Sequence, residues 1–276
     1  MSLRSEHCRT GIEIRKVVKE LYNFRLEGYH QLFMERRLQY FSIKHGIPHP
    51  AVLRDMLINN PQVAENIRKE LQINYSCLYR DPAFFRKMIQ LIRKKINESG
   101  NVRIWHAGCA NGTEVYSLAI LLREQGLLDH CKIYATDFST EALKAARRGV
   151  VDLQEVLCSV KPYLEAGGIH HLREYFNLSG NSAILRSELL QKIRFAKHEL
   201  GHDPVFQEFD FVICRNLLIY YQEFHQKKLV DALLSSTRPM GYIGLTSCES
   251  LSGLTNRPHL HVIDGGQNIY QVRTPQ

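Results

Sequence analysis

The chain has 276 residues, of which 44% are hydrophobic and 23% are charged, a composition typical of a globular protein with a sizeable core. No apolar run approaches the roughly 20 residues that a membrane-spanning helix needs, which excludes an integral helical membrane protein. The formal net charge of +8 lies wholly in residues 1–98, which contain 18 Lys and Arg against 10 Asp and Glu, whereas residues 99–276 contain 18 of each sign. This basic first third favours an acidic partner; the alternative is a basic surface that is only solvated.

Residues 1–98 carry apolar side chains at helical spacing and show no strand pattern. The last helix of this region is expected to begin with Asp81 as its N-cap and Pro82 in the first helical position. We therefore expect residues 1–98 to form an all-helical domain. Its helices are expected near residues 14–21, 32–40, 51–58, 62–72 and 82–96.

From residue 99 onward, short apolar strands alternate with helical patterns, which is typical of an α/β fold with a parallel sheet covered on both faces. Residues 264–266, Asp-Gly-Gly, lie between two further apolar runs and predict a terminal hairpin, which brings the sheet to seven strands. Residues from about 150 to 192 break the rhythm and are expected to form a small inserted subdomain. The other strands are expected at 102–105, 132–136, 193–196, 209–214 and 241–245, and helices near 113–125, 140–148 and 222–235.

The seven cysteines are scattered without a C-x-x-C pair, and residues 1–10 do not have the pattern of a signal peptide. We therefore expect reduced thiols in a cytoplasmic protein, with neither a disulfide framework nor a cysteine zinc site.

A strand, a glycine turn and a helix follow one another in the middle of the chain. The strand Val102–Trp105 leads into a turn that carries Gly108 and Gly112, and a helix is expected to begin near Thr113. Glycine lets a ligand approach the backbone and a helix N-terminus offers free N–H groups, so this arrangement favours a nucleotide-like ligand. The spacing matches neither G-x-G-x-x-G nor the phosphate loop G-x-x-x-x-G-K-[ST], and an ordinary strand–helix turn is the alternative.

Charged residues follow two of the predicted strands, at the sheet edge where doubly wound folds bind their ligands. Asp137 ends the second strand; it is suited to accept both hydroxyl protons of a ribose, or to cap the helix that follows it. Arg215 and Asn216 end the fourth strand, where the arginine either faces a ligand or forms a surface salt bridge.

Five motifs connect these features along the chain. They are Asn74-Tyr-Ser-Cys-Leu-Tyr-Arg80, Trp105-His-Ala-Gly-Cys-Ala-Asn-Gly-Thr-Glu114, Ala135-Thr-Asp137, Phe209-Asp-Phe-Val-Ile-Cys-Arg215-Asn216-Leu-Leu-Ile-Tyr220 and Gly241-Tyr-Ile-Gly-Leu-Thr-Ser-Cys-Glu249. In order and spacing they resemble the chemotaxis receptor methyltransferases of the CheR type, which use S-adenosylmethionine to esterify glutamate side chains of membrane chemoreceptors. The resemblance covers nearly the whole chain.

The resemblance implies a Rossmann-like, seven-stranded class I methyltransferase domain over residues 99–276, an N-terminal helical domain that docks the substrate, and a small inserted β-subdomain. It implies S-adenosylmethionine as cofactor and an acidic helical protein as substrate, namely the cytoplasmic domain of a chemoreceptor, with no metal, nucleic acid or membrane insertion. Arg80 and Tyr220 are implied to lie nearest the methyl transfer. The residues implied to surround the cofactor are Asn74, Ser76, Arg80, Gly108, Glu114, Asp137, Glu199, Leu200, Arg215 and Asn216.

Methyl transfer to a carboxylate needs little acid–base help, because a glutamate with a pKa near about 4.3 is already ionised at neutral pH. Arg80 is expected to orient that carboxylate by a one-sided contact, and Tyr220 to position it through its hydroxyl; the alternatives are an exposed helix-start arginine and a packing tyrosine. The family commonly has Asn where Glu199 stands, but a carboxylate also accepts a hydrogen bond from an adenine amino group.

Four other functions compete with this interpretation. His198-Glu-Leu-Gly-His202 matches the H-E-x-x-H zinc motif, which works only on a helix, yet it contains Gly201 and Pro204 follows it. Methylation of a nucleic acid suits the basic charge, but the amino-methylase motif [DNS]-P-P-[YF] does not follow the fourth strand; a small molecule is another possible acceptor. The last alternative is a non-catalytic module that binds the cofactor and only docks partners.

Overall fold

The structure, a computed structural model, describes residues 16, 20, 28–71, 76–251, 253 and 260–273. The chain forms two units by its internal contacts: residues 1–73 with 220–226, and residues 74–219 with 227–276. The expected helix near residues 14–21 lies largely outside the described residues. Among the residues that are described, no helix combines the length and the apolar character needed to cross a bilayer.

The first unit is helical over its described residues. Pro50 and Pro61 each occupy the first position of a helix, where the fixed φ of proline is favourable and its missing N–H is not needed. Apolar side chains from all three described helices form one core, which includes Met34, Leu38, Phe41, Leu53, Leu57 and Ile67. The helices are α2 (Gln31–Lys44), α3 (Pro50–Asn59) and α4 (Pro61–Leu71), which confirm those expected between residues 32 and 72.

The second unit is built on a seven-stranded sheet with the order β6-β2-β1-β7-β8-β10-β9. Neighbouring pairs among the first five strands are parallel, and β10 is antiparallel to both β8 and β9. The strand order reverses between β1 and β7, and ligands of doubly wound sheets bind at such a switch point. The strands are β1 (Val102–Ala107), β2 (Cys131–Asp137), β6 (Ile193–Lys197), β7 (Phe209–Ile213), β8 (Thr237–Gly244), β9 (Leu260–Asp264) and β10 (Ile269–Val272).

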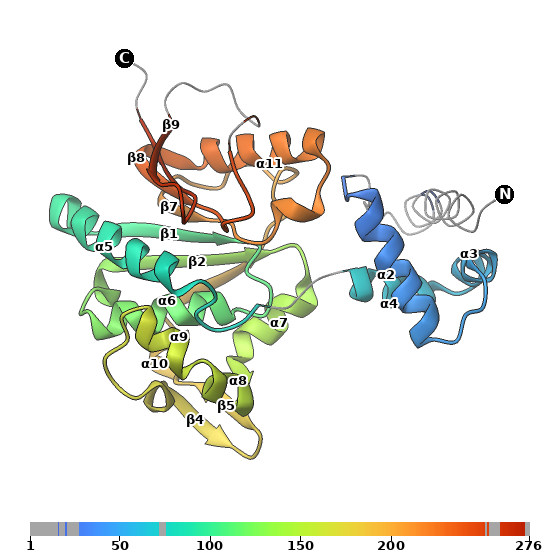
Figure 1. Ribbon diagram of the computed structural model, residues 1–276, viewed down its shortest axis with the longest axis horizontal. Coiled ribbons are helices and arrows are strands. Elements are labelled where there is room, and N and C mark those ends of the chain that lie inside the picture. Colours follow the sequence, from blue (N-terminus) through green and yellow to red (C-terminus); the bar gives the residue numbers. More distant parts are fainter. Residues whose placement is uncertain are drawn as a thin grey trace. The chain divides into compact units, whose positions relative to one another are not determined.

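The predicted α/β architecture is therefore confirmed, including the terminal hairpin. Four longer helices accompany the sheet: α5 (Pro82–Ser99), α6 (Thr113–Glu124), α7 (Thr140–Arg148) and α11 (Glu223–Ser235). Helices α5 and α6 pack against each other, and α7 packs on β2 and β6 (Figure 1). Short 3-10 turns lie at Leu128–His130, Leu172–Tyr175 and Leu218–Tyr220.

Helix α5 belongs to the second unit, although the sequence pattern predicts residues 1–98 as one helical domain. Its buried side chains, among them Phe84, Phe85, Met88 and Ile92, join the core of the sheet. The periodicity of α5 reveals which face is apolar but not which partner that face meets.

The small inserted β-subdomain is present between α7 and β6. It contains a three-stranded antiparallel sheet with the order β3-β5-β4. Glu124, near the end of α6, accepts hydrogen bonds from the hydroxyl groups of Tyr163 and Tyr175 and from the backbone N–H groups of Ile169 and His170, and so fastens the insertion to the main sheet. Its elements are β3 (Val150–Asp152), α8 (Leu153–Cys158), α9 (Val160–Glu165), β4 (Phe176–Ser179), β5 (Ser182–Leu185) and α10 (Ser187–Leu190).

Candidate active site

The turn after β1 carries two glycines with left-handed backbone conformations. The angle φ is +76° at Gly108 and +88° at Gly112, and a Cβ on Gly112 would lie 2.7 Å from the hydroxyl oxygen of Tyr116. The backbone N–H groups of Gly108 and Cys109 both donate to the carbonyl oxygen of Thr136. The predicted glycine turn is thus present, and it is fixed against the carboxyl end of β2.

Asp137 is buried at the end of β2 and is held by backbone donors on both oxygens. Its Oδ2 accepts from the N–H of Ala110 at 3.0 Å and its Oδ1 from the N–H of Ser139 at 2.8 Å. Burial raises the pKa of this carboxyl group, while the backbone hydrogen bonds act in the opposite direction. The cap of α7 is the hydroxyl of Ser139, which accepts from the N–H of Ala142, so the structure does not support the alternative that Asp137 caps this helix.

The guanidinium of Arg215 connects three segments that are far apart in the chain. Its side chain is only 1% exposed, and it pairs with the carboxylates of Asp81 and Glu114; the distance from Nη1 to Oε2 of Glu114 is 2.7 Å. The same Nη1 donates to the carbonyl oxygen of Arg80 at 3.1 Å, and the guanidinium carbon lies 4.3 Å from the ring centre of Phe84. Arg215 is therefore a buried cation, which rules out the alternative of a surface salt bridge.

Glu114, at the start of α6, has a second neighbour in His106 of β1. The distance between Nδ1 of His106 and Oε1 of Glu114 is 3.6 Å, and both side chains are largely buried. Burial acts to raise the pKa of Glu114, but Arg215 and His106 outweigh it and hold the pKa below its ordinary value. Glu114 is thus an anion at neutral pH inside the fold.

The segment that precedes α5 has an unusual backbone. Tyr79 and Asp81 have φ of 54° and 59°, in the left-handed region that non-glycine residues rarely adopt. Leu78 and Tyr79 are buried and Ser76 is half-buried, whereas the side chain of Arg80 is exposed and has no hydrogen-bond or ion-pair partner among the described residues. Asp81 occupies the N-cap position of α5 without making a capping hydrogen bond, because its carboxylate is directed to Arg215.

The loop after β7 is held by a carboxylate that is not among the predicted site residues. Glu249 is buried and accepts from the backbone N–H groups of Asn216 at 3.0 Å, Leu218 at 2.7 Å and Thr246 at 3.2 Å. Burial raises its pKa, and the backbone hydrogen bonds oppose that effect. Asn216 has a φ of 58°, so Glu249 stabilises a strained residue at the end of β7. The signal that could have revealed it is an acidic residue closing the last motif.

Glu199 and Leu200 lie in the turn that follows β6, beside the end of β2. The N–H of His198 donates to the carbonyl oxygen of Asp137 at 3.1 Å, and Oε1 of Glu199 lies 3.3 Å from Nδ1 of His202. Residues 198–202 do not form a helix, so the H-E-x-x-H sequence lacks the helical geometry that a zinc protease requires.

Two predicted residues are not placed at this site by the structure. Asn74 lies outside the described residues. Tyr220 belongs to the first unit, where its ring centre lies 4.9 Å from that of Phe33 and its carbonyl oxygen accepts from the N–H of His30. Its catalytic role stays a prediction.

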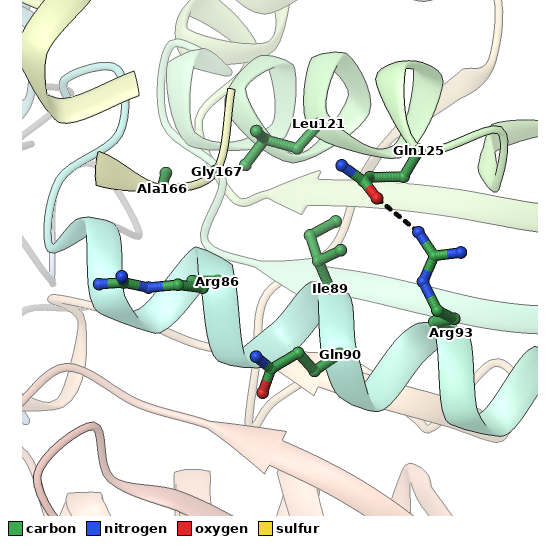
Figure 2. A pocket seen from close by; sticks show the side chains of 8 residues that line it. All are labelled: Arg86, Ile89, Gln90, Arg93, Leu121, Gln125, Ala166 and Gly167. Carbon is green, nitrogen blue, oxygen red and sulfur yellow. Dashed lines mark hydrogen bonds between the residues drawn. The ribbon is translucent and has the colours of Figure 1, made fainter. Parts of the chain in front are cut away.

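A cavity of about 310 Å³ lies between α5, α6 and the turn after α9. Figure 2 shows Arg93 reaching from α5 to the side-chain oxygen of Gln125, the residue that follows α6. The cavity is lined by Arg86, Ile89, Gln90, Arg93, Leu121, Gln125, Ala166 and Gly167, none of which is a predicted site residue.

Comparison with known proteins identifies the family. The family described as CheR methyltransferase, SAM binding domain, matches residues 74–264. A Pseudomonas putida protein named "Putative methyltransferase Cher3" is 31% identical over 245 residues, which cover 88% of this chain and 90% of that protein. A chemotaxis protein methyltransferase of Borreliella burgdorferi is 26% identical and covers 91% of this chain and 92% of its own. Chemotaxis protein methyltransferase 2 of Pseudomonas aeruginosa is 29% identical, covering 72% and 70%. The chain belongs to the CheR family of S-adenosylmethionine-dependent methyltransferases.

Proposed function

We propose that this protein transfers the methyl group of S-adenosylmethionine to glutamate side-chain carboxylates of a chemoreceptor or a related signalling protein, forming methyl esters. Membership of the CheR family and the similarity to chemotaxis methyltransferases support the reaction class. The single observation that carries the proposal is the buried Arg215, which holds Glu114 and the segment of Arg80 and Asp81 at the carboxyl end of β7.

The residues around the switch point fit S-adenosylmethionine. The turn at Gly108 and Gly112 brings the backbone close to a ligand, and the carboxylate of Asp137 has lone pairs left for ribose hydroxyls. Nδ2 of Asn216 is buried without a hydrogen-bond partner within the described part of the chain, so it has donors for a bound group. We assign the remaining cofactor contacts to Asn74, Ser76, Arg80, Glu114, Glu199, Leu200 and Arg215.

The bound cofactor supplies a methyl group on a positively charged sulfur, and the chain has to place the acceptor carboxylate in line with it. Holding reacting atoms within about 3–3.5 Å is worth several kcal/mol. Arg80, whose guanidinium is exposed, donates to one carboxylate oxygen and leaves the other free to attack. We assign the hydroxyl of Tyr220 to the same positioning task. No general base is needed, because a glutamate with a pKa near about 4.3 is ionised at neutral pH.

The basic N-terminal helices are proposed to dock the acidic helical substrate, the cytoplasmic domain of a chemoreceptor. Residues 1–98 contain 18 basic and 10 acidic side chains. Helix α2 has no acidic residue in its first turn and contributes Arg36, Arg37 and Lys44. In this proposal the second unit, residues 74–219 with 227–276, carries the catalytic domain, with the insertion at about 150–192. Opposite charge favours the encounter of enzyme and receptor.

The test is methyl labelling of membranes from the same organism with tritiated S-adenosylmethionine, followed by mild base. We expect label on an acidic membrane protein and its release by base as methanol, because carboxylate esters are base-labile. Label on nucleic acid would contradict the proposal, and cofactor binding without any transfer would favour the non-catalytic alternative.

Arg80→Ala tests the assignment of the acceptor-binding arginine, and Arg86→Ala, which removes another exposed arginine one turn into α5, is the matched control. We expect Arg80→Ala to lower kcat by about 100-fold or more and cofactor affinity by far less, since a lost transition-state contact of several kcal/mol acts on rate. Equal losses of rate and affinity would contradict this division of roles.

A further inference from the structure

The segment of residues 77–81, which carries Arg80, does not hold its shape by local preference. Two of its non-glycine residues, Tyr79 and Asp81, are left-handed. Such conformations persist only where the surroundings over-determine them, and they cluster at functional sites. The contacts that hold this segment therefore decide where the guanidinium of Arg80 lies.

Three backbone groups in a row are held by side chains from three different regions. The N–H of Leu78 donates to Oε1 of Glu155 at 3.0 Å, and the N–H of Tyr79 donates to Oγ of Ser117 at 3.0 Å. The carbonyl oxygen of Arg80 accepts from Arg215. Ser117 is on α6 and Arg215 follows β7, both in the part of the second unit that contains the seven-stranded sheet, whereas Glu155 is on α8 of the inserted subdomain.

A second contact also comes from the insertion. The ring centre of Tyr163, on α9, lies 5.2 Å from that of Tyr79. Tyr163 is anchored by Glu124, which also accepts from the hydroxyl of Tyr175. The insertion is therefore a fixed support for the segment that precedes α5.

Packing alone does not explain a carboxylate at position 155. The side chain is half-buried, and burial raises the pKa of its carboxyl group. An uncharged residue at this position would avoid the free-energy cost of desolvating a carboxylate. What Glu155 provides is an acceptor for the buried Leu78 N–H, which would otherwise be left without a partner.

We propose that Glu155 is a positioning residue for methyl transfer: through the Leu78 N–H it fixes the left-handed segment that presents Arg80, and so the inserted subdomain takes part in catalysis. This inference rests on the role of Arg80 under the proposed function. The mechanism requires an acceptor atom at this position and does not require a charge.

The experiment compares Glu155→Ala with Glu155→Gln in the full-length protein. Both variants remove the charge, but glutamine keeps a carbonyl oxygen that accepts from the Leu78 N–H. Glu165→Ala, which removes an exposed carboxylate from the neighbouring helix α9, is the matched control. The readouts are kcat, KM for the acceptor protein, the cofactor Kd by calorimetry, and hydrogen exchange of the peptide that contains residues 77–80.

We expect Glu155→Ala to lower kcat by about tenfold or more, with cofactor Kd within about threefold of wild type, because a buried N–H left without its acceptor costs about this factor or more. Exchange in residues 77–80 should accelerate by a similar factor. Glu155→Gln and Glu165→Ala should stay close to wild type in kcat and in the hydrogen exchange of residues 77–80.

Equal losses in the Ala and Gln variants would overturn the proposal, because the charge rather than the acceptor would then matter. A parallel loss of kcat, cofactor affinity and thermal stability in Glu155→Ala would also overturn it, as a purely structural role. If the wild-type protein methylates no acidic protein, the proposed function fails. The positioning role of Glu155 is then judged by hydrogen exchange alone: faster exchange of residues 77–80 confined to Glu155→Ala supports this role, and unchanged exchange refutes it.

Discussion

The buried pair of Arg215 and Glu114 should contribute to stability only as a pair. Removing Arg215 leaves Glu114, whose side chain is 13% exposed, without its main counter-charge, while Asp81, at 41%, is still solvated. Breaking one side of a buried ion pair costs about 3–5 kcal/mol, whereas replacing both partners by neutral groups of similar volume is close to neutral. We therefore expect Arg215→Met to lower the free energy of unfolding by about 3 kcal/mol or more, and Glu114→Gln to lower it by less, because Asp81 still pairs with Arg215 in that variant.

The double variant should be no less stable than Arg215→Met, so its loss of unfolding free energy should be smaller than the sum of the two single losses. Methionine is chosen because a flexible thioether is suited to pack on the Phe84 ring that Arg215 covers. The assay is urea unfolding of the four proteins without cofactor, analysed as a double-mutant cycle. Losses that add within about 0.5 kcal/mol would refute the coupling, since independent sites behave in that way.

The pH dependence of the same pair has a definite sign. The pKa of Glu114 is lowered in the folded state, so its contribution to stability is present above the unfolded pKa of about 4.3 and is lost as pH falls through the folded pKa. The difference in unfolding free energy between wild type and Glu114→Gln should therefore be constant near neutral pH and shrink below about pH 4. A difference that grows on acidification would contradict the assigned charge state.

Three further substitutions test other parts of the site. Gly112→Ala should lower both the melting temperature and the cofactor affinity more than Gly126→Ala does. Both glycines have positive φ, but only at position 112 would the new Cβ collide with Tyr116. Equal effects of the two substitutions in calorimetry would contradict this steric argument. Glu249→Gln should cost about 1–3 kcal/mol in urea unfolding, since both carboxylate oxygens accept backbone N–H groups and an amide nitrogen cannot; an unchanged midpoint would show that these bonds are dispensable. Tyr79→Phe should leave stability unchanged or raise it by up to about 1 kcal/mol, because the hydroxyl is buried without a partner among the described residues; a clear loss in thermal unfolding would reveal an unseen partner.

Features that depend on local chain chemistry could be predicted from the sequence. The apolar runs specify the strands, and the glycines at 108 and 112 specify a turn that only residues tolerant of positive φ form easily. Asp137 follows directly from its place at a strand end, since the carboxyl ends of parallel strands meet at one edge. Local propensity also sets the start of α5 at Pro82, but it does not determine the use of the carboxylate that precedes it.

The partners of the buried polar groups were decided by tertiary structure alone. Asp81 is expected to cap a helix from its local sequence, yet it pairs with an arginine 134 residues away. Glu155 and Glu249 accept from backbone N–H groups, which every non-proline residue carries and which therefore leave no mark in the sequence. The amphipathic face of α5 could pack on either unit, and only the fold shows that it joins the sheet. Sequence patterns record which surfaces must be buried and where the backbone must turn, whereas the matching of buried donors to acceptors depends on chain segments that only the assembled fold brings together.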